Sequence, residues 1–271
     1  MPVVKWVGGK RQLLSSLTPL LPDRFTTYCE PFLGGGAMLF WQQPKKAIVN
    51  DINSDLIQMY QVIRDDVENL ILELEKYKNE AECFYKVRDW DRDKVKYGGL
   101  SDVAKASRII FLNKTCYNGL FRVNNAGEFN TPFGHYKNPN IVNTPTLRAV
   151  SKYFKENDIT FHCCNYTEIL AELSHDTFVY LDPPYDPVSD TANFTGYSRG
   201  GFSKEDQIQL RECCDDLTRR GINFMLSNSA TEFIKQQYAA YNITIVQAKR
   251  AINSDIAGRG QVDEVVVRNY E

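Results

Sequence analysis

TTYCEPFLGGGAMLFW, residues 26–41, predicts the fold of the chain that surrounds it. Residues 26–29 have the pattern of a short buried strand, the three glycines at 34–36 form a loop, and the apolar residues from Ala37 onward are typical of the start of a helix. A strand that runs through a glycine-rich loop into a helix is a building unit of α/β folds. Glycines in such a loop let the backbone approach a ligand closely.

The alternation of strand and helix continues along the chain. Further short strands are predicted at 47–51, 159–163, 177–181, 223–226, 243–247 and 264–267. Helical stretches such as 204–220 separate most of them, which predicts a mainly parallel sheet covered on both faces. Between the second and third strands the pattern changes to helical spacing over 56–78 and 104–112, followed by an Asn-, Gly- and Pro-rich stretch at 118–143 with loops and a hairpin.

The composition suits a globular protein with one insertion. We expect an α/β domain formed by 1–57 and 151–271 and an inserted, helical and loop-rich domain at 58–150. Hydrophobic residues make up 43% of the chain, and no apolar run approaches the roughly 18 residues of a membrane span. The N-terminus lacks the apolar segment of a secretion signal. The seven cysteines lack metal-binding spacing and the three histidines are scattered, so we expect a cytoplasmic protein with reduced thiols, no metal and no membrane partner.

Charge is distributed unevenly, although the net charge is only −2. Residues 65–93 contain ten acids and five bases, whereas residues 105–153 contain seven Lys and Arg and a single acid, Glu128. The second stretch is also rich in asparagine and aromatic residues, a composition typical of surfaces that meet phosphates and base edges. Within it, Lys114 and Lys137 are candidate phosphate contacts. A solvated loop that is merely basic would show the same charge pattern.

EPFLGGG, residues 30–36, is the candidate ligand loop. It lacks the third glycine of a dinucleotide fingerprint, and Gly8-Gly9-Lys10 lacks the features of a Walker loop, so NAD and ATP are poor fits. Asp51 ends the second predicted strand, where it can accept hydrogen bonds from two ribose hydroxyls. A nucleoside without a phosphate cradle, S-adenosylmethionine, fits better. Asp51 could instead cap a helix that begins at Ile52.

LDPPY, residues 181–185, ends a buried-looking run with an acid, two prolines and an aromatic residue. No nearby basic residue in the sequence pairs with Asp182, and the prolines stop the strand and stiffen the chain. If an exocyclic amine of a base is to accept a methyl group, the Asp182 carboxylate and the Pro183 carbonyl can accept its two N–H groups. Pro184 fixes that carbonyl, and Tyr185 can lie flat against the base. Such preorganised dipoles carry much of the catalysis in a dry site; a plain strand-to-loop break is the alternative.

In three blocks the chain resembles DNA adenine-N6 methyltransferases of the Dam type, which modify GATC. These blocks are KWVGGK at 5–10, EPFLGGG at 30–36 and DPPY at 182–185, in the order of the family's alpha class. The resemblance covers nearly the whole chain and implies a Rossmann-like methyltransferase sheet with an inserted helical DNA-recognition domain. It implies the catalytic residues Asp182, Pro183, Pro184 and Tyr185. It also implies S-adenosylmethionine as the cofactor, bound by Trp6, Lys10, Phe32, Gly34, Gly36, Asp51, Asn165, Tyr166 and Asp182.

The insertion carries a second likeness, because YNGLFR at 117–122 and GEFNTPFG at 127–134 are similar to the family's recognition hairpin. The resemblance implies guanine contacts from Arg122 and Lys5, and contacts to the central thymine from Leu120 and Pro132. It implies that Tyr117 and Asn118 hold the distorted duplex around a flipped base. ANFTGY at 192–197 resembles the loop that closes over that base.

The sequence therefore predicts a site-specific methyltransferase that moves a methyl group from S-adenosylmethionine to N6 of adenine in double-stranded DNA, in GATC, after flipping the adenine from the duplex. Another DNA sequence, N4 of cytosine or RNA are alternatives, because DPPY suits any amine conjugated to a ring. An oxidoreductase would need the missing glycine and phosphate cradle, and a DNA-binding module without catalysis would not need LDPPY. Asn165-Tyr166 departs from the Asp-Phe that relatives often carry beside the cofactor adenine. The sequence defines neither an oligomeric state nor a partner restriction nuclease.

Overall fold

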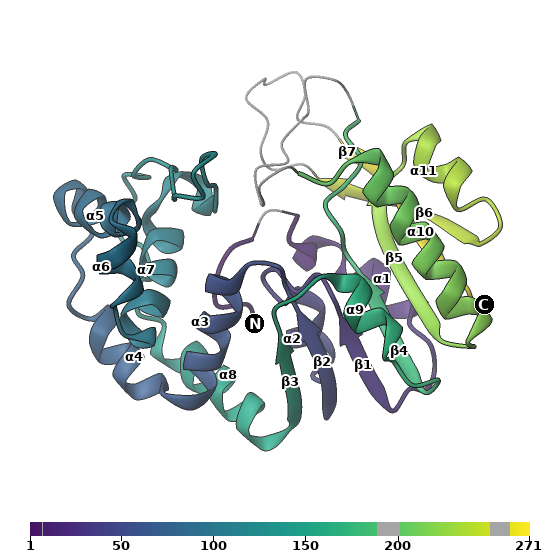
Figure 1. Cartoon of the computed structure of the whole chain (residues 1–271), viewed down its shortest axis with the longest axis horizontal. Helices are drawn as coiled ribbons and strands as arrows, with labels where there is room; N and C mark the ends of the chain where they lie inside the picture. Colours follow the sequence, from purple (N-terminus) through teal and green to yellow (C-terminus); the bar gives the residue numbers. More distant parts are fainter. Residues whose placement is uncertain (7, 189–200, 250–260) are drawn as a thin grey trace.

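The computed structural model describes residues 1–6, 8–188, 201–249 and 261–271, which include a seven-stranded sheet (Figure 1). The strand order is β3-β2-β1-β4-β5-β7-β6. The strands are β1 Thr27–Glu30, β2 Lys46–Asn50, β3 Asp158–His162, β4 Thr177–Leu181, β5 Asn223–Ser229, β6 Asn242–Lys249 and β7 Gln261–Arg268. All neighbouring pairs are parallel except those of β7, which runs antiparallel to β5 and β6. The predicted mainly parallel, Rossmann-like α/β fold is confirmed.

The central strands β1 and β4 are buried at every position because both faces of the sheet are covered. All residues of β1 and β4 are buried, as expected for parallel strands with helices on each side. Alternate side chains of β4 enter different cores: Phe178 and Tyr180 pack into one cluster, while Val179 and Leu181 pack into the other. Figure 1 shows that the strands β1 to β4 lie between the layers of helices.

The helices are α1 Leu14–Leu17, α2 Ala37–Gln42, α3 Ser54–Asp65, α4 Val67–Leu74, α5 Ala81–Arg88, α6 Lys94–Gly98, α7 Asp102–Thr115, α8 Thr144–Glu156, α9 Tyr166–Ala171, α10 Lys204–Arg219 and α11 Glu232–Gln237. The helical spacing over 56–78 corresponds to two helices, because Asp66 separates α3 from α4 with φ −142° and ψ 48°. In Figure 1, α4 to α7 form a lobe beside the β3 edge of the sheet, with α3 and α8 between the lobe and the sheet.

The helical lobe and the sheet share one hydrophobic core. Tyr60 of α3, Phe111 of α7 and Phe154 of α8 belong to the same buried cluster as Phe178 of the sheet. The division of the chain at residues 57/58 and 150/151 therefore stays a prediction. The two boundaries lie within α3 and α8, and these helices pack against both the lobe and the sheet. Among the described residues, no helix has the length and apolar character needed to cross a membrane.

Candidate active site

The carboxyl ends of β1, β2, β3 and β4 meet at one edge of the sheet, where parallel α/β sheets bind their ligands. Asn50, the last residue of β2, ties three of these ends together. Its side-chain Nδ2 donates to the carbonyls of Pro31 at 3.0 Å and Cys164 at 3.1 Å, and its Oδ1 accepts from the Cys164 amide at 3.0 Å. Asn50 is 1% exposed, so its three hydrogen bonds fix the loops around the site.

The glycine loop lies directly under Trp6. Gly34 has φ +49° and Gly36, which precedes α2, has φ +64°, conformations that favour glycine. A Cβ added at Gly34 would lie 2.7 Å from Cδ1 of Trp6. The Tyr60 hydroxyl donates to the Gly34 carbonyl at 3.0 Å. The structure thus brings together Trp6, Gly34 and Gly36, three of the predicted cofactor residues.

Asp51 holds the glycine loop against the end of β2. Its Oδ2 accepts from the Gly34 amide at 2.8 Å and its Oδ1 from the Asn53 amide at 2.9 Å. Burial raises the pKa of the Asp51 carboxyl. The cap of α3 is Asn53, whose side chain accepts from the Leu56 amide at 3.1 Å, so Asp51 is not the helix cap. Between them stands Ile52, 63% exposed, an apolar side chain that the sequence analysis missed.

Three aromatic rings gather beside this edge. Phe32 of the glycine loop lies 5.0 Å from Tyr166, centroid to centroid, and 6.1 Å from Phe202. Asn165 caps α9, because its Oδ1 accepts from the Thr167 amide at 3.0 Å while Glu168 bonds back to the Asn165 amide. The predicted pair Asn165 and Tyr166 is therefore placed by a capping box. Phe202 was missed, since it precedes α10 without any motif.

Asp182 is paired in the structure, with a basic residue that is far from it in the sequence. Lys10, from the N-terminal block, lies 2.9 Å from Asp182 Oδ1, and its ammonium also donates to the Gly8 carbonyl at 2.6 Å. Burial raises the pKa of Asp182 to about 6, and Lys10 opposes that rise. Lys10 is 4% exposed. An ion pair so enclosed interacts more strongly than one at the surface.

Tyr185 is held on two sides. Its hydroxyl donates to Oε2 of Glu264 on β7 at 2.7 Å, and the Lys10 ammonium lies 4.4 Å from the centre of its ring. Burial, followed by the Asp182 and Glu264 carboxylates, raises the pKa of Tyr185 well above its ordinary value. Glu264 was missed because no motif marks an acid in a strand that is otherwise rich in valine.

A buried polar network fixes the loop that follows β4. Gln207 donates to the Pro184 carbonyl at 2.8 Å and accepts from the Asn228 side chain at 3.0 Å. Asn228 Oδ1 accepts from the Asp186 amide at 3.0 Å, and Thr231 donates to the Asp186 carboxylate at 2.7 Å. Because Gln207 and Asn228 are at most 1% exposed, the Asp182–Tyr185 segment cannot move without breaking buried hydrogen bonds.

A second buried acid lies behind the glycine loop. Glu30 accepts from the Tyr28 hydroxyl at 2.8 Å and from the Leu39 amide at 3.2 Å, in the first turn of α2. Burial raises the pKa of Glu30 to about 8, and the nearby Asp182 carboxylate contributes to that rise. Glu30 therefore acts as an anchor for α2 and limits the negative charge beside Asp182.

The predicted recognition residues lie on a hairpin and on the segment before it. Isolated bridges join Cys116 to Phe133 and Val123 to Phe129, and a tight turn spans 124–128. This confirms a hairpin within the stretch 118–143. The residues predicted to meet DNA here are placed as follows: Tyr117 is 57% exposed, Asn118 has φ +57°, Leu120 is partly buried, and Pro132 and Lys137 are exposed.

Arg122 and Lys5 are both oriented by asparagines. Arg122 donates through Nε to Asn130 Oδ1 at 2.7 Å, across the hairpin. The backbone of Lys5 exchanges two hydrogen bonds with the Asn113 side chain, at 2.8 and 2.7 Å. Lys5 therefore stands next to the hairpin although it is far from it in sequence.

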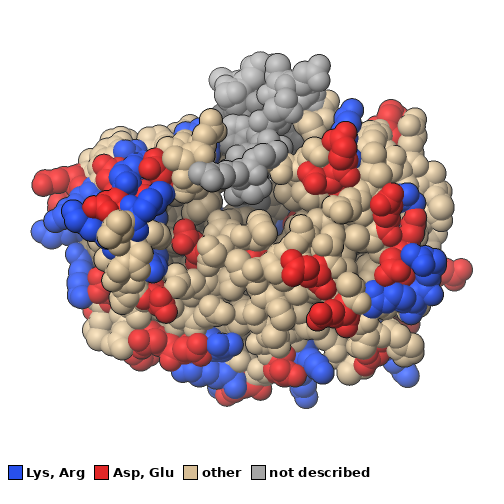
Figure 2. All heavy atoms as spheres, in the orientation of Figure 1, with Lys and Arg blue, Asp and Glu red and all other residues tan. Residues whose placement is uncertain are grey.

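Lys114 belongs to a small basic cluster. Burial lowers the pKa of Lys114, followed by the charges of Lys5 and Arg11. Arg11 is exposed and was not predicted. On the face seen in Figure 2, acidic and basic side chains are interleaved over the helical lobe, and the face in front of the sheet is mostly uncharged. On that face, Lys and Arg side chains are therefore not gathered into one continuous basic patch.

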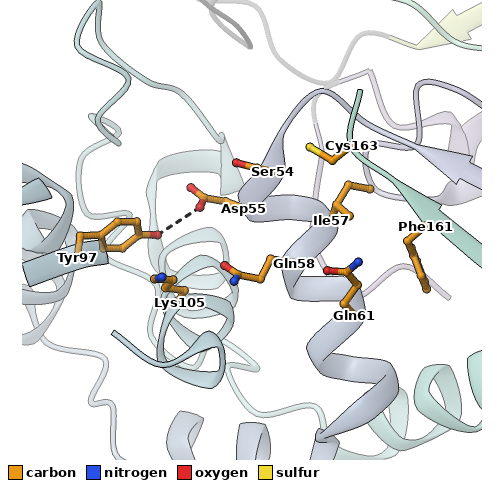
Figure 3. Close-up of a pocket in the computed structure, with 9 residues that line it drawn as sticks. All are labelled: Ser54, Asp55, Ile57, Gln58, Gln61, Tyr97, Lys105, Phe161 and Cys163. Carbon is orange, nitrogen blue, oxygen red and sulfur yellow. Dashed lines mark hydrogen bonds between the residues drawn. The ribbon is translucent and has the colours of Figure 1, made fainter. Parts of the chain in front are cut away.

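A cavity of about 420 Å³ lies between α3, the helical lobe and β3 (Figure 3). It contains none of the predicted site residues. Figure 3 shows the Tyr97 hydroxyl pointing to Asp55, with a hydrogen bond of 3.4 Å. Cys163 borders it, and burial raises the pKa of that thiol, as do, to a smaller extent, the charges of Asp51 and Asp55.

Among the described residues, no group of three or more His, Cys, Asp and Glu side chains could hold a metal ion.

Comparisons with known proteins identify a family. The model of the family described as D12 class N6 adenine-specific DNA methyltransferase matches residues 6–252. The chain is 40% identical to the type II methyltransferase M1.LlaDCHI of Lactococcus lactis subsp. cremoris, over 99% of this chain and 95% of that protein. It is 42% identical to the type II methyltransferase M.MjaIII of Methanocaldococcus jannaschii, over 99% of each. It is 33% identical to the DNA adenine methylase of Vibrio cholerae, over 97% of this chain and 94% of that protein.

Proposed function

Because the chain belongs to the D12 class family of N6 adenine-specific DNA methyltransferases, we propose that this adenine-specific enzyme uses S-adenosylmethionine to methylate the adenine of GATC, and that it flips this adenine from the duplex. The observation that carries the proposal is the position of the Asp182–Tyr185 segment. It lies at the same strand-end edge as the glycine loop. The N-terminal block 5–10 contacts both regions, because Trp6 lies against the glycine loop and Lys10 pairs with Asp182. A methyl donor held by the loop would face an amine held at Asp182.

The residues at this edge fit S-adenosylmethionine. Asp51 lies at the end of β2, where it can meet ribose hydroxyls. Phe32 and Tyr166 offer ring faces for an adenine, and the exposed Ile52 offers a second apolar surface near Asp51. The glycine loop, with Trp6 against it, lets the backbone lie close to the rest of the ligand. When bound, the cofactor supplies an electrophilic methyl carbon on its sulfonium sulfur.

The chain's own residues prepare the amine. The lone pair of adenine N6 is delocalised into the ring, which makes it a weak nucleophile. Asp182 and the Pro183 carbonyl accept its two N–H groups and stabilise the positive charge that develops as N6 bonds to the methyl carbon and the carbon–sulfur bond breaks. Gln207 occupies the Pro184 carbonyl, which keeps the segment in one orientation. The proton leaves N6 after the methyl transfer. Tyr185 stacks on the base and so keeps the amine aligned with the methyl group.

The hairpin supplies the proposed sequence specificity. With Nε of Arg122 bonded to Asn130, its two terminal nitrogens are directed away from that bond and can pair with N7 and O6 of a guanine. Leu120 and Pro132 are proposed to meet the central thymine, and Tyr117 and Asn118 to support the duplex around the flipped adenine. Lys5, Lys114 and Lys137 are proposed guanine and phosphate contacts.

Rates of methylation on GATC and on each of its single-base variants test this assignment. Arg122→Ala is expected to lower the rate on GATC by roughly tenfold or more, since a paired contact to guanine contributes about 1–3 kcal/mol of discrimination. The methylation rate of this variant on sites altered only at the last base pair is expected to differ little from that of the wild type. Lys137→Ala serves as the control and should weaken all sites alike. A wild-type enzyme without preference for GATC would refute the proposed target, while leaving adenine methylation intact.

A further inference from the structure

Glu264 contacts a proposed catalytic side chain, although nothing in the sequence marked it. It stands on β7, opposite Ser229 of β5 and Val246 of β6, and is followed by the buried Val265. Its carboxylate accepts the Tyr185 hydroxyl at 2.7 Å. Hydrogen bonds to an ionised acceptor are shorter and stronger than neutral ones, so this contact restrains the ring from its far end.

Lys10 also restrains the Tyr185 ring. Lys10 lies over the Tyr185 ring at 4.4 Å and pairs with Asp182 at 2.9 Å. Tyr185 is thus held at its hydroxyl by one charged group and at its ring face by another. Stacking alone needs only a ring, which phenylalanine would provide. The hydroxyl of Tyr185 must therefore serve a purpose other than stacking.

We propose that Glu264 is a positioning residue for methyl transfer, which sets the plane of the Tyr185 ring through the bond to its hydroxyl, so that the ring meets the target adenine in the reactive orientation. The inference rests on the catalytic role proposed above for Asp182–Tyr185. A ring free to rotate would still bind the base, but the amine would reach the donor in line less often. Loss of Glu264 should consequently lower kcat more than it raises KM.

The same carboxylate acts on Asp182 through space. Its negative charge raises the pKa of Asp182, whereas Lys10 lowers it. The other titratable groups that interact with Asp182 lie on neighbouring strands and on its own loop: Glu30, Tyr180 and Tyr185. Removing the charge of Glu264 should therefore move the acid limb of the kcat profile to lower pH. Removing only the Tyr185 hydroxyl leaves that charge in place and takes away an interaction that lowers the pKa of Asp182, so the acid limb of Tyr185→Phe should move to higher pH.

Four variants separate positioning from simple support of the fold: Glu264→Ala, Glu264→Gln, Tyr185→Phe and the double variant Glu264→Ala/Tyr185→Phe. Glu264→Ala is expected to lower kcat by roughly tenfold to a hundredfold, the size of one hydrogen bond to a charged group, with cofactor affinity unchanged. Glu264→Gln keeps an acceptor and should restore most of kcat while its acid limb lies at lower pH. The double variant should be no slower than Tyr185→Phe. Asp263→Asn, exposed on the same strand, is the matched control and should behave as wild type.

The opposite results overturn the inference: a wild-type kcat in Glu264→Ala, additive losses in the double variant, or a loss confined to KM. If Glu264→Ala does not fold, the comparison of Glu264→Gln with Tyr185→Phe still decides, because only a positioning role predicts a lower kcat in Tyr185→Phe. Asp182→Ala and Tyr185→Ala are measured alongside. If both remain active, the proposed catalytic segment is wrong; if both are inactive while the Glu264 variants match wild type, only the role of Glu264 is wrong.

Discussion

The role proposed for Asp182 requires an ionised carboxylate in surroundings that favour the neutral form. Burial raises its pKa to about 6, and the Lys10 ammonium at 2.9 Å works against that effect. A carboxylate can accept the N–H of an adenine amine at each oxygen, whereas a protonated carboxyl loses part of that capacity. The ion pair with Lys10 thus keeps the acceptor available near neutral pH.

Lys10→Met should shift the acid limb of the kcat profile to higher pH. Without the ammonium, the pKa of Asp182 rises above its wild-type value, so a larger fraction of enzyme is protonated at pH 7, and activity returns as the pH is raised. A shift of one unit corresponds to about 1.4 kcal/mol of lost charge interaction. The measurement is kcat from pH 5 to 9 at saturating cofactor. Arg11→Met, exposed on the same turn, is the control, and an acid limb that stays in place in Lys10→Met would contradict the account.

At this scale the motifs predicted the candidate site but not the side chains that contact it. DPPY and the glycine loop were assigned from short patterns, since each pattern is local in the chain. Lys10 was expected near the cofactor, yet its pairing with Asp182 was not predicted, and Glu264 and Gln207 carry no motif at all. These contacts arise because the fold brings η1 (Lys10–Gln12), β7 and α10 to the end of β4.

At the scale of elements, strands were easier to predict than helix ends. β4 is buried on both faces and contains the apolar run 178–181, which is visible in the sequence. The break between α3 and α4 depends on the backbone of a single residue, Asp66, and helical periodicity continues across it. The Asn- and Gly-rich composition predicted the hairpin, but the groups that anchor it come from another part of the chain.

The hairpin is fastened to the lobe by a buried acid. Asp91 accepts the Phe129 amide at 2.7 Å and pairs with Arg108 at 2.7 Å, and both charged side chains are at most 7% exposed. Arg92 adds a bond of 2.7 Å to the Phe129 carbonyl and a pair of 3.0 Å with Glu128. The hairpin proposed to recognise DNA therefore depends on the acidic stretch 65–93, which the sequence analysis treated only as a contrast in charge.

Asp91→Asn should loosen the hairpin without affecting the cofactor site. Arg108 would lose its buried counter-charge, and breaking a buried pair costs about 3–5 kcal/mol. We expect faster hydrogen exchange over 116–134, a KM for DNA raised by roughly tenfold or more, and an unchanged Kd for S-adenosylmethionine. Asp89→Asn is the control, because Asp89 is 50% exposed. Unchanged exchange over the hairpin, together with an unchanged KM, would show that Asp91 does not anchor it.

At the scale of the molecule, the glycine loop and the hairpin are connected through Trp6. Trp6 lies against the glycine loop and stacks on Phe121 of the hairpin, with ring centroids 5.0 Å apart and planes 23° apart. The sheet and the lobe also share one hydrophobic core. The mainly parallel sheet followed from the sequence through the alternation of strands and helices, whereas the order of the strands was not predicted. The shared core did not, because periodicity shows which face is apolar but not which element covers it.

One segment predicted to complete the site is ANFTGY at 192–197, the loop expected to close over the flipped base. It lies outside the described residues. The proposed mechanism therefore rests on the part of the edge that the structure describes: the glycine loop, Asp51, Lys10 and the Asp182–Tyr185 segment.

Sequencing of modified bases in DNA from cells that express the chain tests the central claim most directly. The host must lack adenine methylation of its own. The account predicts N6-methyladenine in GATC with the wild-type chain, and none with Asp182→Ala produced at the same level, because the amine then loses its charged acceptor. N6-methyladenine at equal density with Asp182→Ala, or methylation of cytosine by the wild-type chain, would contradict the account.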